Sequence, residues 1–279
     1  MDFFKKERKA LAMKISIITV NFNDASGLAG TIRSVIDQKK ADYEYIVIDG
    51  GSTDGSVEII NQYADKIDYW VSEKDRGIYH AMNKGVAQAH GDYCLFLNSG
   101  DCFYDNSVMS DISRLMDDYD IVVGKVMIGN SDNFISPPPN SGELTMYHLY
   151  SGAIPHQGSF IKTCLLREYP YDENLLITSD WKFFIQTLIL DNCSVIFVDK
   201  IVARYDITGI SSRRQDLMEL EKRVILSEMF PSRILADYSK MKRSECLTLS
   251  LCQSLRVSYK IDFLLYNLGK FLLKILHKI

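Results

Sequence analysis

Between residue 15 and about residue 127, short β-branched and apolar runs alternate with segments whose apolar residues recur every third or fourth position. That alternation is typical of βαβ units, which build a largely parallel sheet flanked by helices. The expected strands are Ile15–Val20, Tyr45–Ile48, Tyr69–Val71, Tyr93–Leu97 and Ile121–Val126. The expected helices are Leu28–Ile36, Val57–Tyr63, Ile78–Ala89 and Val108–Met116. We therefore expect an α/β fold, in which ligands bind in the crevice at the carboxyl ends of the strands.

The second half of the chain is less regular. Three consecutive prolines, Pro137–Pro139, predict a loop or an edge excursion because proline cannot continue a helix or a central strand. Beyond them we expect a strand near His156–Ile161, a helix at Ser179–Leu190, strands near Val195–Val198 and Ile201–Tyr205, and helix from Ser211 onward. The expected divisions are an extension at 1–13, two halves of one domain at 14–128 and 129–210, and a helical C-terminal appendage at 211–279.

The charge of the chain is unevenly distributed. Its net charge is −4, which provides no general field for binding a polyanion, so we expect no nucleic acid partner. Residues 240–279 nevertheless carry eight basic side chains against two acidic ones, a net +6, which leaves −10 for the remainder.

The six cysteines form no Cys-x-x-Cys pair and have no zinc-like spacing to histidine. They indicate reduced thiols. The first 13 residues are charged and lack the apolar core of a signal peptide, and no run approaches the roughly 18 apolar residues of a membrane span. We expect a cytoplasmic protein.

Polar turns follow the first two strands, where the crevice is expected. The first contains Asn21 and Asn23, and the second contains Asp49, Ser52 and Asp54. Neither is the Gly-x-Gly-x-x-Gly of a dinucleotide site, and no phosphate-binding Gly-x-x-x-x-Gly-Lys loop is present. These side chains are candidates for binding a nucleotide, although Ser52 and Asp54 are equally typical of helix caps.

Four motifs occur in order over some 85 residues: Asn21-Phe22-Asn23, the turn Asp49-Gly50-Gly51-Ser52-Thr53-Asp54-Gly55, the segment Asp75-Arg76-Gly77-Ile78-Tyr79 with Asn83-Lys84-Gly85, and Gly91-Asp92-Tyr93 before a strand and loop. Together they resemble the donor half of a family 2 glycosyltransferase with a GT-A fold. The resemblance implies a nucleotide-sugar donor, usually a uridine diphosphate sugar, with Asp49 near the uracil. It also implies an Asp-x-Asp loop that holds Mn²⁺ or Mg²⁺ on the diphosphate.

The metal loop departs from the family pattern. Asn98 and Gly100 stand where the common form has its two aspartates, so Asp101 is the remaining carboxylate and the candidate metal ligand. Met82 replaces an arginine, which leaves Asn83 and the cations Arg76 and Lys84 to contact the donor. Solvated charges beside a helix start are the alternative for both cations.

The family resemblance also implies an aspartate base at the start of a helix, and Asp180 is the matching residue. The alternative is a structural first-turn aspartate that interacts with the helix dipole. Further candidates for contact with donor or acceptor are His156, Gln157, Trp181 and Arg213. Trp181 is either a stacking platform for a sugar or a core residue, and Arg213 follows a Gly-Ile-Ser segment that resembles the part of relatives that closes over the donor.

Residues 260–279 form an amphipathic pattern, with leucine and isoleucine on one helical face and lysine opposite. Such a helix is typical of a peripheral contact with an anionic membrane, here the inner face of the cell membrane. The alternative is docking on the domain or on a partner subunit in a homo-oligomer.

We therefore expect an inverting glycosyltransferase that transfers a sugar to a glycan or lipid-linked acceptor in bacterial surface polysaccharide synthesis. The alternative is a catalytically silent nucleotide-sugar binding or scaffold protein, because the metal motif is degraded. A sugar nucleotidyltransferase would need a Gly-rich, Arg-containing loop after the first strand, and Asn21 to Gly30 provides none.

Overall fold

The computed structural model describes residues 14–39, 42–116, 119–129, 133–135 and 144–254. Two compact units, Met1–Ile225 and Leu226–Ile279, divide the chain, and each is described by itself. The strands are β1 Ile15–Asn21, β2 Tyr43–Asp49, β3 Tyr69–Ser72, β4 Tyr93–Phe96, β5 Cys102–Phe103, β6 Ile121–Ile128, β7 Phe134–Ile135, β8 Ser159–Lys162 and β9 Val195–Tyr205. The α-helices are α1 Ala25–Ile36, α2 Ser56–Gln62, α3 Ile78–Gln88, α4 Val108–Ile112, α5 Met146–Ser151, α6 Thr163–Glu168, α7 Ser179–Phe184, α8 Ile210–Arg213, α9 Gln215–Met229 and α10 Ser232–Ser254. Short turns of other helix types are η1 Ala64–Lys66, η2 Ser113–Leu115, η4 His156–Gly158 and the π-helical η5 Ile185–Leu190.

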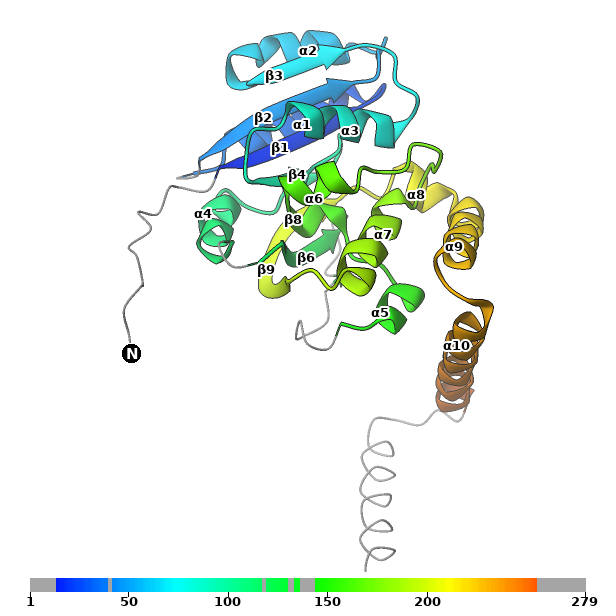
Figure 1. Ribbon diagram of the computed structural model, residues 1–279. Coiled ribbons are helices and arrows are strands. Elements are labelled where there is room, and N and C mark those ends of the chain that lie inside the picture. Colours follow the sequence, from blue (N-terminus) through cyan, green and yellow to red (C-terminus); the bar gives the residue numbers. More distant parts are fainter. Residues whose placement is uncertain (1–13, 40–41, 117–118, 130–132, 136–143, 255–279) are drawn as a thin grey trace, which may run out of the picture. The chain divides into compact units, whose positions relative to one another are not determined.

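The described strands form one mixed sheet in the order β3-β2-β1-β4-β8-β6-β9-β5, with β7 paired to β6 (Figure 1). The first four run parallel, and their register places Asn21 opposite Asp49 and Asp49 opposite Ser72. Strand β8 runs antiparallel to both β4 and β6. The α/β class expected from the sequence is confirmed.

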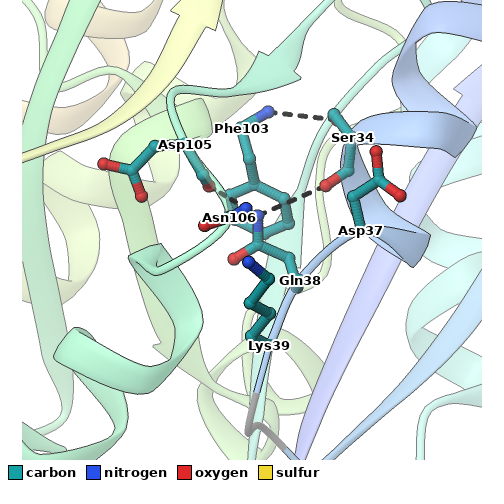
Figure 2. Close-up of a pocket in the computed structure, with 7 residues that line it drawn as sticks. All are labelled: Ser34, Asp37, Gln38, Lys39, Phe103, Asp105 and Asn106. Carbon is teal, nitrogen blue, oxygen red and sulfur yellow. Dashed lines mark hydrogen bonds between the residues drawn. The ribbon is translucent and has the colours of Figure 1, made fainter.

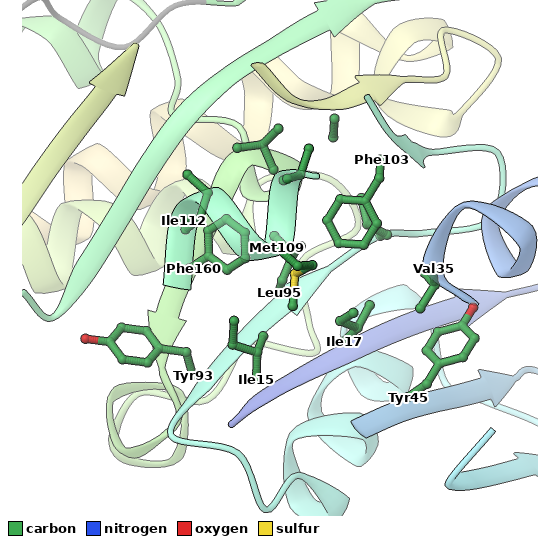
Figure 3. Packing of buried hydrophobic residues seen from close by; sticks show 14 of the residues in the cluster. Ile15, Ile17, Val35, Tyr45, Tyr93, Leu95, Phe103, Met109, Ile112 and Phe160 are labelled. Atoms are coloured by element: carbon green, nitrogen blue, oxygen red, sulfur yellow. The ribbon is translucent and has the colours of Figure 1, made fainter. Parts of the chain in front are cut away.

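Alternate residues of β1 face two different layers of helices. Ile15 and Ile17 belong to an apolar core that also contains Val35 of α1 (Figure 3). Leu28 and Ile32 of the same helix are part of this core. Ile18 points to the other face, where it meets Gly85 of α3. A Cβ on Gly85 would collide with the Ile18 side chain. The two helix layers therefore pack on opposite sides of the central strands.

The five strands expected in the first half are confirmed within two residues at each end. Two short strands, β5 and β7, were not expected, because a two-residue strand has no period to detect. The two strands expected near 195–205 are the single strand β9. Asp199 and Lys200 interrupt its apolar pattern, but β9 pairs with β6 on both sides of them through a register shift.

The C-terminal region is helical as far as the structure describes it. The first compact unit includes α8 and most of α9, where Glu221 and Ile225 are buried. None of the described helices is long and apolar enough to cross a bilayer. The amphipathic segment expected to contact a membrane, 260–279, lies outside the described residues.

Candidate active site

Asp49, at the end of β2, is completely enclosed by hydrogen-bond donors. Its Oδ1 accepts bonds from Asn21 Nδ2 at 2.7 Å and Ser52 Oγ at 2.6 Å, and its Oδ2 accepts from Ser72 Oγ at 2.6 Å and from two backbone amides of the turn. Burial alone would raise the pKa of Asp49, but the bonds from Ser52, Ser72 and Asn21 outweigh it and lower the pKa. Asp49 is 0% exposed and joins the ends of three strands. Its expected contact with uracil stays a prediction.

The other polar residues of the two turns are also engaged within the protein. Asn23 Oδ1 accepts the Thr53 amide at 2.9 Å, and Ser52 Oγ accepts the Asn23 amide at 2.7 Å. Asp54 accepts the Ala25 amide at the start of α1 and the Ser56 amide at the start of α2, at 2.8 and 3.1 Å. The capping alternative thus describes Asp54, and these side chains shape the crevice wall.

The loop before α3 and the helix itself hold cations that are already paired. Arg76 forms an ion pair with Glu173. Lys84 Nζ lies 2.9 Å from Glu73 and 2.5 Å from Asp75. Burial lowers the pKa of Lys84, but the carboxylates of Asp75 and Glu73 raise it by more, so its pKa lies above the ordinary value. The side chain is therefore a stable cation.

Asn83 has a different partner from the expected donor. Its amide donates to the Tyr171 carbonyl at 2.8 Å and accepts the Tyr171 backbone amide at 3.0 Å. It also contacts Glu173 at 3.2 Å. Both ends of the Asn83 amide therefore bond to the segment before α7, and its expected contact with the donor stays a prediction.

Asp180 lies in the first turn of α7 and is 18% exposed. Its Oδ1 accepts bonds from Tyr79 Oη at 3.1 Å and from the Trp181 amide at 2.9 Å, and its Oδ2 lies 2.7 Å from His156 Nδ1. Burial and then the charge of Asp180 raise the pKa of Tyr79 well above its ordinary value, so the phenol donates. Sequence reasoning did not identify Tyr79 as a site residue, although it lies in a motif of the donor half.

His156 connects Asp180 to the loop after β4. Its Nε2 lies 3.4 Å from Asn98 Nδ2, and the Oδ1 of Asn98 is buried without a hydrogen-bond partner. Burial lowers the pKa of His156, but the hydrogen bond and charge of Asp180 outweigh it and raise the pKa above the ordinary value. Three expected site residues from distant parts of the sequence therefore form one hydrogen-bonded row.

Asp101 is only 3% exposed, and both of its carboxylate oxygens have protein donors. Oδ1 accepts the Asp206 amide at 2.8 Å, and Oδ2 accepts Gln157 Nε2 at 3.2 Å. Burial raises the pKa of Asp101 to about 6. Across the described residues, no three or more His, Cys, Asp or Glu side chains are grouped so as to hold a metal ion. A hard divalent cation held by protein groups alone needs several oxygen ligands, so this donor set does not fit a resident ion. The expected role of Asp101 as a ligand to a metal that the donor diphosphate also holds stays a prediction.

Two further expected contacts are placed by the structure. Trp181 is 3% exposed, its indole N–H donates to the Leu149 carbonyl at 2.8 Å, and Lys222 Nζ lies 5.2 Å from the ring centroid. This burial and the bonded indole N–H favour the core interpretation of Trp181 over a sugar platform. Arg213 is exposed at the end of α8, and its contact with a donor stays a prediction.

A hollow of about 450 Å³ lies away from this row, and none of the residues of the row line it (Figure 2). It is lined by Ser34, Asp37, Gln38, Lys39, Phe103, Asp105 and Asn106, at the C-terminal end of α1. The N-terminal end of the same helix faces Asp54 in the crevice wall. Gln38 donates to the Asp105 carbonyl at 2.6 Å across the hollow, so its polar lining is largely paired within the protein.

Comparison with known proteins identifies relatives over most of the chain. The model of glycosyl transferase family 2 matches residues 16–167. An uncharacterized glycosyltransferase of Mycobacterium tuberculosis is 32% identical over 211 residues, which are 73% of this chain and 79% of the relative. A PGL/p-HBAD biosynthesis glycosyltransferase of Mycobacterium bovis is 29% identical over 77% of this chain and 86% of its own.

The fold is also similar to that of a solved structure. Residues 1–349 of Staphylococcus aureus TarS, in complex with UDP-GlcNAc, match 90% of this chain and 78% of that one, with a TM-score of 0.65 and 20% identity. The chain spans 43% of a longer TarS structure.

Proposed function

The chain belongs to glycosyl transferase family 2, and from that premise we propose that it transfers a sugar, with inversion, from a uridine diphosphate donor to a hydroxyl group of a glycan or lipid-linked acceptor. The observation that carries the proposal is the row formed by Asp180, His156 and Asn98. It puts a carboxylate and an imidazole beside the loop at the carboxyl end of β4, where α/β folds bind ligands. A uridine donor agrees with TarS, which was crystallised with UDP-GlcNAc.

Asp180 is the proposed general base. Three protein donors engage its two oxygens, and a carboxylate has about four lone-pair sites, so one site is left for an acceptor hydroxyl. As that hydroxyl oxygen attacks the anomeric carbon from the face opposite the phosphate, its proton passes to Asp180. The bond between the anomeric carbon and the phosphate oxygen breaks, and its electron pair leaves with the diphosphate. Tyr79 and His156 fix the carboxylate in position.

The donor is proposed to bind along the ends of β1 to β3. Phe22 follows β1 and is 65% exposed, which gives the crevice an aromatic surface suitable for a planar base. Lys84 and Arg76 are the nearby cations for the diphosphate, because their present carboxylate partners can be exchanged for phosphate oxygens. The loop at 98–101 does not fit a resident Mn²⁺ or Mg²⁺, so no step is assigned to one.

The acceptor is inferred from one relative and from the C-terminal sequence. The relative from Mycobacterium bovis is named for PGL/p-HBAD biosynthesis, and the C-terminal segment has the charge pattern of a peripheral membrane helix. We propose on these grounds an acceptor attached to a lipid, in the synthesis of a surface glycan.

The test is a panel of nucleotide sugars in which both donor affinity and release of nucleotide diphosphate are measured for wild type, Asp180→Asn and the exposed control Asp199→Asn. We expect one uridine donor to be used. Asp180→Asn should bind this donor with unchanged affinity but release diphosphate about 10² to 10⁴ times more slowly, as is typical for loss of a general base. Unimpaired release in Asp180→Asn would refute the assignment of the base, and failure of wild type to bind any nucleotide sugar would refute the proposed function.

A silent nucleotide-sugar binding protein is the second candidate. The enclosure of Asp101, with no other carboxylate in the Asn98–Asp101 loop, favours it. This candidate predicts donor binding without diphosphate release from any donor in the panel, even with lipid-linked acceptors present.

A further inference from the structure

Glu221 of α9 binds the stretch of chain that leads into α7, the helix that carries Asp180. It is 8% exposed, and its Oε1 accepts the Leu176 amide at 2.7 Å. Its Oε2 accepts the Ile177 and Thr178 amides, each at 3.0 Å, and the Thr178 hydroxyl at 2.9 Å. The two oxygens of this carboxylate are therefore bonded to three consecutive residues, the last of which lies two positions before Asp180.

The hydroxyl of Thr178 is used for this contact and not for capping α7. Thr178 occupies the N-cap position, where a threonine hydroxyl normally accepts an amide of the first turn. It makes no such bond and instead donates to Glu221. The residue at the start of α7 is thus joined to α9 and does not stabilise its own helix through its side chain.

The next residue of α9 contacts the chain on the other side of Asp180. Lys222 Nζ lies 5.2 Å from the ring centroid of Trp181, the residue that follows Asp180. The backbone amide of Trp181 in turn donates to Asp180 Oδ1 at 2.9 Å. Two adjacent residues of α9 therefore hold the chain shortly before and directly after the proposed base.

Helix α7 needs such support because it is short. Its α-helical part has six residues before the π-helical η5 begins, and isolated helices shorter than about 12 residues have little stability of their own. A general base must also keep its geometry closely, since a misplacement of about 1 Å can reduce a rate about a hundredfold. The direction of the Asp180 carboxylate therefore depends on what holds the neighbouring backbone.

We propose that Glu221 is a positioning residue for the transfer reaction: by fixing residues 176–178, it directs the Asp180 carboxylate toward the acceptor hydroxyl. The inference rests on the proposed function, because it takes Asp180 as the base, and it makes α9 a working part of the active site. Helix α9 lies beyond residues 16–167, which match the family model, so this role follows from the contacts alone. The alternative is that Glu221 stabilises the fold without affecting the chemistry of a folded molecule.

A double-mutant cycle between Glu221 and Asp180 separates these two roles. Diphosphate release from the donor that wild type uses, and the dissociation constant of that donor, are measured for Glu221→Gln, Glu221→Ala, Asp180→Asn and the double variant that carries both Glu221→Gln and Asp180→Asn. Each rate is divided by the concentration of donor-binding sites, so that unfolded protein is not counted. Glu219→Gln, at an exposed position of α9, is the matched control.

We expect Glu221→Gln to release diphosphate about tenfold, and Glu221→Ala about a hundredfold, more slowly than wild type, because the base is misplaced. Donor affinity should stay within about twofold of wild type in both variants, since neither touches the donor. In the Asp180→Asn background Glu221→Gln should have almost no effect, because a base that is absent cannot be misdirected. Glu219→Gln should match wild type in rate and affinity. If Glu221→Ala does not fold, Glu221→Gln and the double variant still complete the cycle.

Two results would overturn the inference alone: a wild-type rate per binding site in Glu221→Gln, or an equal loss of rate on Glu221→Gln in the wild-type and Asp180→Asn backgrounds. Both results leave the proposed function standing. If wild type releases no diphosphate from any donor, or if Asp180→Asn releases it as fast as wild type, the proposed reaction or its base is refuted directly, and this inference falls with it.

Discussion

Asp49 and Asp101 are both enclosed carboxylates, yet their environments act on them in opposite directions. Asp49 accepts five hydrogen bonds, which lower its pKa despite its burial. Asp101 accepts two, which do not compensate for burial, and its pKa rises to about 6. The number of donors around a buried carboxylate, more than burial itself, decides whether it remains a stable anion.

The raised pKa of Asp101 predicts that it destabilises the fold as it ionises. Because the folded pKa lies above the ordinary value of 3.8, protonation favours the folded state. That contribution is full below about pH 4 and is lost as the pH rises through about 6. The free energy of unfolding of wild type, relative to Asp101→Asn, should fall by roughly 2 kcal/mol between pH 4 and pH 7.

Denaturant titrations at several pH values measure this difference. The charges of His156 and Asp206 also act on Asp101, but neither is altered in the variant. Asp199→Asn, at a side chain that is 89% exposed, serves as the control and should run parallel to wild type. If the free energies of unfolding of wild type and Asp101→Asn changed with pH in the same way, the prediction would be contradicted.

At the scale of elements, the helix that carries Asp180 is held from outside its own segment. Glu221 of α9 is 8% exposed and accepts the backbone amides of Leu176, Ile177 and Thr178, at 2.7, 3.0 and 3.0 Å. It also accepts the Thr178 hydroxyl at 2.9 Å. One carboxylate thus accepts hydrogen bonds from the backbone N–H groups that lead into α7. These groups need such an acceptor, because the N–H groups at the start of a helix have no partners within the helix.

Removal of this carboxylate should be costly. Glu221→Ala leaves three backbone donors without their acceptor, so we expect unfolding to become easier by about 3 kcal/mol. Glu221→Gln keeps one acceptor oxygen, so it should lose less stability than Glu221→Ala. Glu219→Ala, at an exposed position of the same helix, should change stability by no more than about 0.5 kcal/mol. Chemical denaturation of the three variants checks the order, and equal losses in Glu221→Ala and Glu219→Ala would contradict it.

The sequence predicts the elements of this fold better than the environments of its side chains. Periodicity identifies β1 to β4 and the helices between them, since local spacing decides these. The position of Asp180 in the first turn of a helix follows from a local pattern, whereas its role as a base comes from the family resemblance and stays a prediction. The burial of Asp49 was missed because one of its donors, Ser72, belongs to a strand that becomes its neighbour only in the sheet. Asp75, whose side chain is 9% exposed, stands among Glu73, Lys74 and Arg76 in the sequence, where it resembles one more solvated charge.

For the whole molecule, the boundary of the first compact unit at Ile225 places α8 and most of α9 with the sheet. The sequence favoured a division at residue 211, where the helical pattern begins. Burial of Glu221 and Ile225 explains the difference, since helical periodicity does not show which core a helix joins.

Truncation distinguishes the two boundaries. A chain that ends at Phe230 retains α9 and should unfold near the temperature of the full chain and bind the same nucleotide. A chain that ends at residue 210 loses Glu221, and we expect its Tm to fall by several degrees or more, given a loss of about 3 kcal/mol. Calorimetry of both chains measures this, and equal melting temperatures would contradict it.

The reversed direction of β8 has a consequence for how the two halves of the chain work together. Crevice residues follow the carboxyl ends of β1 to β4. His156 and Gln157 instead lie directly before the first residue of β8, which runs in the opposite direction. If β8 separated from β4 and β6, these two side chains would leave the crevice, while the bonds among Asn21, Asp49 and Ser72 would remain. The bonds that join the ends of β1, β2 and β3 and the row around Asp180 are therefore anchored by different strands, so a local opening can break the second and leave the first intact.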